Sequence, residues 1–187
     1  MYQLQVILGD ITTLTVDAIV NAANSSLMGG GGVDGAIHKA AGSGLLEECI
    51  RIAESRRPNE PCPAGEVVIT GAGKLPVKNV IHTVGPVWRG GAKDEPLLLA
   101  SCYRNSLLLA HEAGLESVAF PNISTGVYGY PKDKAADIAV KTVCETLAET
   151  PGIKRIIFVC FDKENYSLYN TTIDLLYSPD NCRTSSV

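Results

Sequence analysis

Short apolar runs rich in valine and isoleucine recur along the chain. They cover residues 4–8, 18–20, 67–70, 80–84, 118–120 and 156–161. Continuous apolar runs of this length are typical of strands that are buried on both faces. The pattern therefore predicts about six strands at the centre of the molecule.

Between most of these runs, apolar residues recur three or four positions apart, as they do on one face of a helix. Such segments lie at about 34–53 with an interruption at 42–44, at 98–113, from Pro131 to about 147, and at about 163–177. Gly114 stands where a glycine often ends a helix. Strands that alternate with helices predict a three-layer α/β/α fold.

The length and composition fit one folded domain. The chain has 187 residues, of which 45% are hydrophobic and 19% are charged, so a sizeable core is expected and disorder is excluded as the main state. Residues 55–63 are polar and rich in proline, which predicts a surface loop. Residues 178–187 show no periodicity, and we expect a disordered tail beyond a domain at 1–177.

The charge balance excludes some partners. The formal net charge is −4 and the sequence pI is about 5.4, which argues against a protein that binds a nucleic-acid backbone. No apolar run has the roughly 18 residues of a membrane span, and the first residues lack the basic region of a signal peptide. We therefore expect a cytoplasmic protein without a membrane or nucleic-acid partner.

Cysteine and histidine spacing indicates no metal centre. The C-x-x-C pairs of zinc ribbons are absent, and the wide spacing argues against disulfides. We expect most of the six cysteines to be buried thiols, namely most of Cys49, Cys62, Cys102, Cys144, Cys160 and Cys182. The three histidines, His38, His82 and His111, are too scattered in sequence to predict a metal cluster. Spacing alone leaves a nucleophilic cysteine–histidine pair open, without supporting it.

A glycine-rich segment at residues 21–38 joins the second predicted strand to a helix. Exposed amides just before a helix favour an anion site, whereas the alternative is a flexible linker. The pattern Gly30-x-Gly32-x-x-Gly35 also matches the dinucleotide-binding fingerprint. That match is disfavoured because several residues separate the strand from Gly30, and because the acid at the required distance, Glu54, lies in a helical pattern.

A second loop at residues 121–131 follows the strand at 118–120 and precedes another helix. Two such loops at the carboxyl ends of strands predict a crevice for two phosphates. Tyr128 or Tyr130 is a candidate to cover a sugar, and simple packing is the alternative for each.

Three polar residues near these loops are candidates for ligand contacts. Asp10 can accept a hydrogen bond from an exocyclic amine, but an aspartate there is also a common turn or cap residue. Asn24 offers a donor and an acceptor to a ribose, or it forms an Asx turn. Asp34 stands at the start of a helix, where it caps the helix or activates water.

Five segments together resemble the macro domain family, and within it the MacroD-type group of bacterial proteins that process ADP-ribose. They are residues 9–11, 21–24, 29–38, 82–86 and 124–131. The similarity covers about residues 3–177, and the motifs are specific only in combination. The resemblance implies a mixed six-stranded sheet between helices, with an ADP-ribose cleft along its crest.

The same resemblance implies roles for individual residues. Asp10 would bind the adenine amine and Asp34 would activate water, while Asn24 would hold the distal ribose. The other implied binding residues are Ile11 and Phe161 at the adenine, Gly32 and Val33 on one side of the diphosphate, and Ser124, Thr125, Gly126, Val127 and Tyr128 on the other.

Hydrolytic members of the group cleave esters on the distal ribose, both in O-acetyl-ADP-ribose and in proteins that carry ADP-ribose on Asp or Glu. The resemblance implies this activity here, and we expect it to need no metal or cofactor. The partners would be ADP-ribose, its esters and mono-ADP-ribosylated proteins. Attack at the acyl carbon and attack at the anomeric carbon both stay open.

Three alternatives remain at this point. The main one is a reader that binds ADP-ribose without cleaving it, although the pair of Asn24 and Asp34 favours hydrolysis. The others are an RNA-binding or poly-ADP-ribose-binding module, which the acidic charge disfavours, and a nicotinamide-dependent oxidoreductase.

Overall fold

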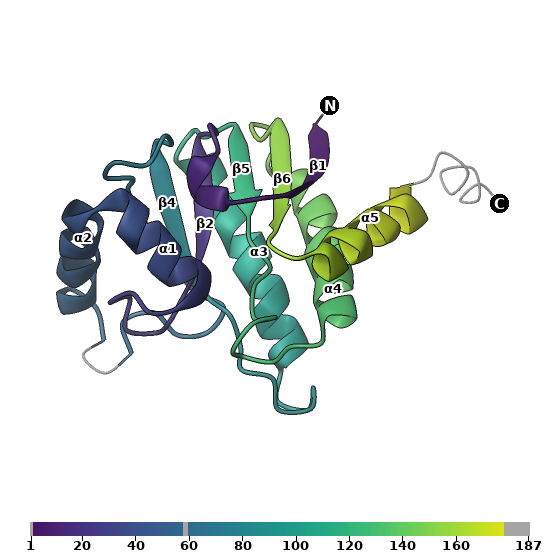
Figure 1. The fold of residues 1–187 in the computed structure, drawn as a ribbon, viewed down its shortest axis with the longest axis horizontal. Coiled ribbons are helices and arrows are strands. Elements are labelled where there is room, and N and C mark those ends of the chain that lie inside the picture. The colour runs from purple at the N-terminus through teal and green to yellow at the C-terminus, as the bar shows by residue number, and fades with distance from the viewer. Residues whose placement is uncertain (1, 58–59, 178–187) are drawn as a thin grey trace.

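Six strands form one mixed sheet in the computed structural model, which describes residues 2–57 and 60–177 (Figure 1). The sheet order is β1-β6-β5-β2-β4-β3. The strands are β1 Gln3–Leu8, β2 Ala18–Ala23, β3 Val67–Gly71, β4 Asn79–Val84, β5 Ser117–Phe120 and β6 Arg155–Cys160. Strand β3 is antiparallel to β4, and the other neighbouring pairs are parallel. The predicted tail at 178–187, with Cys182, lies outside the described residues.

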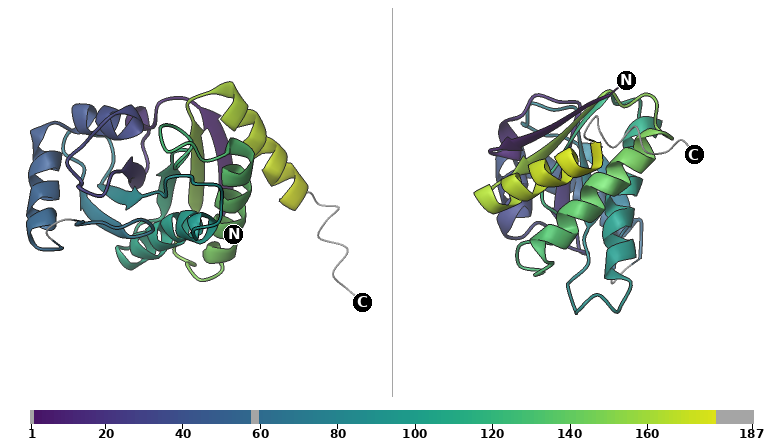
Figure 2. Two further views of the ribbon diagram at one scale, coloured as in Figure 1. Left: turned by 90° about the horizontal axis from the view of Figure 1, so that it is seen from below. Right: turned by 90° about the vertical axis from the view of Figure 1, so that its right-hand side faces the viewer.

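Helices cover both faces of the sheet (Figures 1 and 2). They are α1 Gly32–Ala41, α2 Ser43–Glu54, α3 Glu95–Glu112, α4 Lys132–Leu147 and α5 Lys163–Tyr177, with a short 3₁₀ helix, η1, at Ile11–Thr13. The strands alternate their side chains between two cores. Along β6, Ile156 and Phe158 pack with α3 and α4, whereas Ile157 and Val159 pack with α1 and α2. This arrangement confirms the three-layer α/β/α fold.

Most predicted elements are present, with a few differences at their ends. The helical pattern at 34–53 is two helices separated at Gly42, and Gly114 has a φ of +70° just after the end of α3. Strand β6 ends at Cys160, so Phe161 lies beyond it. The described residues of the predicted loop at 55–63 lie outside helices and strands, as expected. The expected surface position is wrong for Cys62, which is fully buried against Ala23 and neighbouring apolar side chains.

Asp17 lies directly before β2, and its hydrogen bonds connect the start of β2 to the start of β5. Its carboxylate accepts hydrogen bonds from the backbone N–H groups of Glu116 (2.9 Å) and Ser117 (3.0 Å) and from the Ser117 hydroxyl (2.9 Å). Lys78 Nζ lies 2.7 Å from the other oxygen. Partial burial acts to raise the pKa of Asp17, but these partners outweigh it and lower the pKa to about 2.

Asp17→Asn is expected to lower the free energy of unfolding by about 1–3 kcal/mol at pH 7, because hydrogen bonds to a charged acceptor are lost. A depressed pKa contributes stability above the unfolded value of 3.8, and that stability is lost as the pH falls toward 2. Thermal unfolding of both proteins between pH 7 and pH 2 should therefore give curves that converge in acid. A difference that stays constant across this range would contradict the assignment.

Candidate functional site

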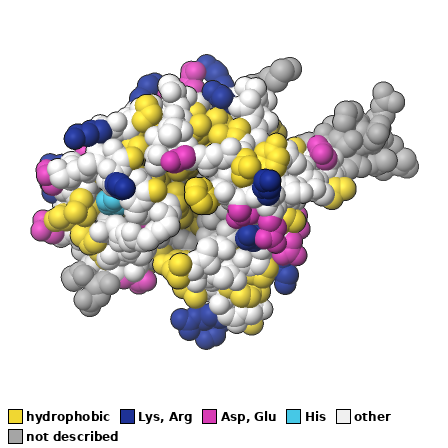
Figure 3. All heavy atoms as spheres, in the orientation of Figure 1, with side chains coloured by type: hydrophobic (Ala, Val, Ile, Leu, Met, Phe, Trp, Pro, Cys, Tyr) yellow, Lys and Arg dark blue, Asp and Glu magenta, His cyan; other side chains and the backbone are white. Residues whose placement is uncertain are grey.

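A cavity of about 610 Å³ lies at the carboxyl ends of the central strands. This volume lies within the usual range for small-molecule sites. On the face drawn in Figure 3, hydrophobic side chains gather around a hollow near the middle, and charged side chains lie mostly around it. All the binding residues implied by the resemblance line the cavity, namely Asp10, Ile11, Asn24, Gly32, Val33, Asp34, Ser124, Thr125, Gly126, Val127, Tyr128 and Phe161.

One wall of the cavity is the first loop, residues 24–31, together with the start of α1. Gly31 caps α1 in an extended conformation without a side-chain hydrogen bond, and Gly32 has a φ of +59°, which favours glycine. Among the hydrogen bonds of the described residues, none is donated by a backbone N–H of residues 30–33. Unpartnered amides at the start of a helix are an arrangement that favours the binding of an anion.

The opposite wall is the second loop, residues 121–131. It is closed by hydrogen bonds from Tyr130 N to Ser124 O (3.0 Å) and from Gly129 N to Gly126 O (2.9 Å). In the described part of the chain, no hydrogen bond has the N–H of residues 125–128 as its donor. The second loop therefore offers a further set of amides to the cavity.

Ser124 of the second loop has a strained backbone conformation and a hydroxyl that makes no hydrogen bond. Its φ is +65°, a region that costs a non-glycine residue about 1–3 kcal/mol, and its buried hydroxyl has no hydrogen-bond partner. The loop rests on the end of β4, because a methyl group at Gly85 would overlap the Ser124 hydroxyl and come within 2.7 Å of Ile123 Cγ2. Both the strain and the unpartnered hydroxyl are consistent with a site that a ligand completes.

The cavity is acidic rather than basic. Among the described residues that line it, Asp10, Asp34 and Asp162 are charged, and none is Lys or Arg. A phosphate bound there would be held by backbone amides and the dipole of α1 rather than by a cationic side chain.

Asp34 lies buried at the third position of α1 and accepts a hydrogen bond at Oδ1 from Asn21 Nδ2 (2.7 Å). His38 Nε2 lies 3.5 Å from the same oxygen. A Cβ atom at Gly30 would lie 3.2 Å from Asp34 Oδ2 and 3.3 Å from Asn24 Nδ2, so the two side chains converge there. The interpretation of Asp34 as a helix cap is wrong, because Gly31 occupies that position.

Burial raises the pKa of Asp34, and the Asn21 hydrogen bond and the neighbouring His38 offset this only in part. A carboxylate with a raised pKa is a better proton acceptor than an ordinary aspartate, provided that the pH keeps it ionised. The environment therefore suits a general base.

Asn24 and Asp10 also hold their own loops together, as the local interpretations of both residues predict. Asn24 Oδ1 accepts from Ser26 N (3.0 Å) in an Asx turn, and its Nδ2 donates to Gly29 O (2.8 Å). Asp10 caps η1, since Oδ1 accepts from the backbone N–H (2.9 Å) and hydroxyl (2.7 Å) of Thr12. Both residues nevertheless line the cavity.

Comparison with known proteins identifies the fold family. The family model described as "Macro domain" matches residues 20–139. The chain belongs to the macro domain family. An O-acetyl-ADP-ribose deacetylase from Citrobacter rodentium is 59% identical to it over 167 residues, covering 89% of this chain and 93% of the relative.

Two solved structures are similar to this macro domain along most of its length. The Oceanobacillus iheyensis macrodomain with ADP has a TM-score of 0.88 and 47% identity, covering 92% of this chain and 90% of that one. The Trypanosoma brucei macrodomain in complex with ADP-ribose has a TM-score of 0.82 and 42% identity, covering 91% of this chain and 69% of that one. The sheet order differs from that of a dinucleotide-binding fold, in agreement with the sequence argument.

Aromatic side chains of this macro domain divide between core and cavity. Tyr130 is buried and packs on Trp88 with ring centroids 4.6 Å apart, so packing is its role. Tyr128 lines the cavity. Val127 and Phe161 also line it, and both side chains are largely exposed, which leaves apolar surface for a ligand to cover.

Across the described helices, none is both long and apolar enough to span a membrane.

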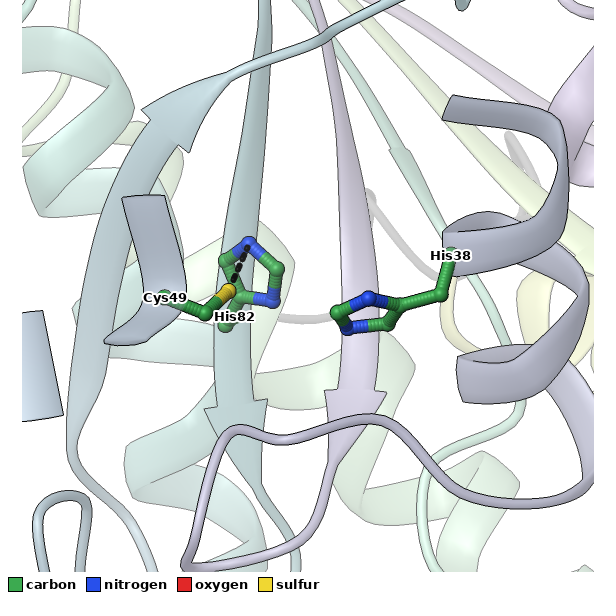
Figure 4. A group of neighbouring side chains, drawn as sticks. All are labelled: His38, Cys49 and His82. Carbon is green, nitrogen blue, oxygen red and sulfur yellow. Dashed lines mark hydrogen bonds between the residues drawn. The ribbon is translucent and has the colours of Figure 1, made fainter. Parts of the chain in front are cut away.

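The expectation that the histidines are scattered is wrong for two of them. Helices α1 and α2 pack over the sheet and bring His38 and Cys49 toward His82 of β4, with one potential ligand atom of each within 4.8 Å of the others (Figure 4). The set has the composition of a zinc site, but both His82 nitrogens have other partners. Nε2 lies 2.9 Å from Thr70 Oγ1, and Nδ1 lies 3.1 Å from Asn21 Nδ2.

A Cys–His pair also exists, with Cys49 Sγ 3.9 Å from His82 Nε2. Its sulfur is not poised for nucleophilic chemistry, because burial raises the pKa of the Cys49 thiol to about 11 and the residue does not line the cavity. Cys62, Cys102 and Cys160 are likewise buried, as predicted for most of the cysteines, whereas Cys144 is half-buried.

The structure adds Asn21 to the candidate site. It is fully buried in the apolar strand β2 and yet donates to Asp34. A single asparagine within an otherwise apolar strand was the available signal, because a buried amide needs hydrogen-bond partners.

Proposed function

We propose that this macro domain is a hydrolase that cleaves esters on the distal ribose of ADP-ribose, with O-acetyl-ADP-ribose as a substrate. The observation that carries the proposal is the convergence of Asp34 and Asn24 beside Gly30, between two loops that present backbone amides. The deacetylase to which the chain is 59% identical supports the choice of substrate.

The binding mode follows from the lining of the cavity. The diphosphate lies between the amides of the two loops, where the start of α1 favours negative charge. Asp10 accepts a hydrogen bond from the adenine amine, and Phe161 lies against the adenine ring. Asn24 holds the distal ribose next to Asp34.

In the reaction, Asp34 takes a proton from a water molecule as that water attacks the ester. For attack at the acyl carbon, a new C–O bond forms to the acyl group and the bond to the ribose oxygen breaks. The proton taken up by Asp34 passes to that leaving ribose oxygen, so the products are ADP-ribose with a free hydroxyl and acetic acid, which ionises to acetate. Asn24 contributes by orienting the ribose, and the oxyanion is stabilised by polar groups of the site. Hydrolysis in ¹⁸O-water tests this route, since acyl attack places the label in acetate.

Incubation of the purified protein with O-acetyl-ADP-ribose tests the activity itself. Release of acetate and ADP-ribose in equal amounts is the expected result. Tight binding of ADP-ribose without any acetate release would instead support a reader that does not cleave its ligand.

We extend the proposal to removal of mono-ADP-ribose from Asp and Glu side chains of proteins, since these linkages are also esters of the distal ribose. We further propose that the protein acts in the cytoplasm without nucleic acid. No metal is needed in this scheme, because Asp34 supplies the base and the His82 nitrogens are engaged. Turnover is therefore expected to be unchanged after treatment with a chelator.

Phe161→Ala is expected to weaken ADP-ribose binding by about 1–3 kcal/mol, the usual cost of losing an aromatic partner of a base. Its side chain is 88% exposed, so the variant should unfold at nearly the same temperature as the wild type. Calorimetric titration with ADP-ribose measures the loss. Leu97→Ala is a matched control, because Leu97 is 68% exposed on α3 away from the cavity, and equal effects of the two changes would rule out the stacking role.

A further inference from the structure

We propose that His82 is a positioning residue for the reaction, acting through Asn21: its imidazole holds the Asn21 amide with the nitrogen toward Asp34. The inference rests on the proposed role of Asp34 as the base. His82 does not line the cavity, so any effect on turnover must pass through other residues.

A continuous chain of polar contacts crosses the core below the cavity. It runs from Thr70 of β3 to His82 of β4 (2.9 Å), to Asn21 of β2 (3.1 Å), and to Asp34 of α1 (2.7 Å). Asn21 and His82 are register partners in the parallel pair of β2 and β4. All four side chains are buried, so water does not compete for these contacts.

Thr70 sets the tautomer of His82. The Thr70 hydroxyl has one hydrogen to donate. Its oxygen, Oγ1, lies 2.9 Å from Gly71 O and 3.4 Å from Val80 O, and both of these carbonyl oxygens are acceptors. When that hydrogen is donated to a carbonyl, the hydroxyl accepts from His82 Nε2–H. Nδ1 then carries a lone pair, which faces Asn21.

The lone pair on His82 Nδ1 in turn fixes the orientation of the Asn21 amide. Its NH₂ group donates one hydrogen to Nδ1 and the other to Asp34 Oδ1. The reversed amide would place its oxygen against a lone pair and a carboxylate at once. In the structure, Asn21 Oδ1 is buried and accepts no hydrogen bond, which carries a free-energy cost. Both N–H groups of the same amide have acceptors, which offsets that cost.

This orientation matters for Asp34 because a donor to the carboxylate favours its ionised form. The titratable groups near Asp34 are His38 from its own helix and Cys49 from α2, and the same two residues face His82. Burial lowers the pKa of His82 to about 3, with His38 adding to the effect, so the imidazole stays neutral where Asp34 titrates. Losing the Asn21 donor would therefore raise the pKa of Asp34 further.

Thr70→Val tests the chain at the contact farthest from the cavity. Without the hydroxyl, His82 Nε2–H loses its oxygen acceptor and keeps only the weak contact with Cys49 Sγ at 3.9 Å. The other tautomer then gains population, and Asn21 turns its oxygen toward Nδ1–H. We expect the acid limb of the kcat–pH profile to move up by about one unit, which is about tenfold in kcat below the limb. The Kd of ADP-ribose should change by less than about threefold, because no cavity group is altered.

Thr146→Val is the matched control. It removes a buried hydroxyl that donates to a backbone carbonyl, Thr142 O, within α4. It should leave the acid limb in place even if it costs similar stability. A limb that moves equally in both variants, or in neither, would overturn the proposal.

Substitutions of His82 itself separate positioning from packing. His82→Asn keeps an acceptor near the place of Nδ1 and should retain most of the wild-type pH profile, whereas His82→Phe fills the space without an acceptor and should shift the limb. If the acid limb of the kcat–pH profile falls at the same pH in these two variants, that result would count against the proposal.

Nuclear magnetic resonance supplies a readout that is independent of activity. The imidazole ¹⁵N shifts should show His82 protonated at Nε2, and carboxyl ¹³C titration should show a higher Asp34 pKa in Thr70→Val. An Nδ1–H tautomer in the wild type would overturn the inference. If Asp34 titrates as expected but its removal leaves turnover intact, the proposed function fails while the hydrogen-bond chain stands.

Discussion

Asp34→Asn is expected to reduce turnover of O-acetyl-ADP-ribose by about 10²–10⁴-fold, the usual contribution of a general base. Asparagine has nearly the same shape and still offers an oxygen to Asn21, but it cannot take a proton from water. ADP-ribose affinity should stay within about tenfold of the wild type. Steady-state kinetics and calorimetry on the same preparation measure both quantities.

Asp174→Asn makes the same change on the exposed face of α5 and should leave turnover unaffected. The wild-type pH profile provides a second check. Because burial raises the pKa of Asp34 above 3.8, activity should fall in acid at a pH higher than an ordinary aspartate would give. Undiminished turnover in Asp34→Asn would refute the base assignment.

Gly85→Ala is expected to lower the free energy of unfolding by about 1–3 kcal/mol and to abolish detectable ADP-ribose binding. The added methyl group would overlap the Ser124 hydroxyl and press on Ile123. Since Ile123 is fully buried, the loop must move rather than its neighbours. That movement displaces the amides of residues 125–128 from the cavity.

Gly44→Ala is the control for Gly85→Ala. Nothing lies within 4 Å of a methyl group at Gly44 in helix α2, so this change should stabilise the protein by about 0.5–1 kcal/mol. Chemical denaturation and ADP-ribose titration of both variants give the comparison. Wild-type affinity in Gly85→Ala would show that the second loop does not depend on its contact with β4.

The sheet and its helices were predictable because their signal is local. Apolar runs identified all six strands. Helical spacing gave four segments, and the one interrupted at residues 42–44 is the pair α1 and α2. The 3₁₀ helix at Ile11–Thr13 was not predicted, since three residues are too short to show a period. The register and the order of strands depend on contacts between distant segments, which periodicity does not encode.

The lining of the site was predicted by motif, whereas its supporting interactions were not. Asp10, Asn24 and Asp34 follow strands or open a helix, so their positions at the crest of the sheet follow from chain direction. The meeting of His38 with His82 depends on how α1 packs over β4, and distance along the sequence gave the wrong expectation. Asn21 lies in the motif at residues 21–24, but the strand was predicted to end at residue 20, so neither its burial within β2 nor its contact with Asp34 was expected.

A crystal structure of Asp34→Asn bound to uncleaved O-acetyl-ADP-ribose would show whether the two loops hold the diphosphate and whether residue 34 faces the ester. We predict the diphosphate between the amides of residues 30–33 and those of residues 125–128, with the ester of the distal ribose beside Gly30 and a water molecule between it and residue 34. A diphosphate bound elsewhere, or a distal ribose turned away from Asn24 and residue 34, would contradict the account.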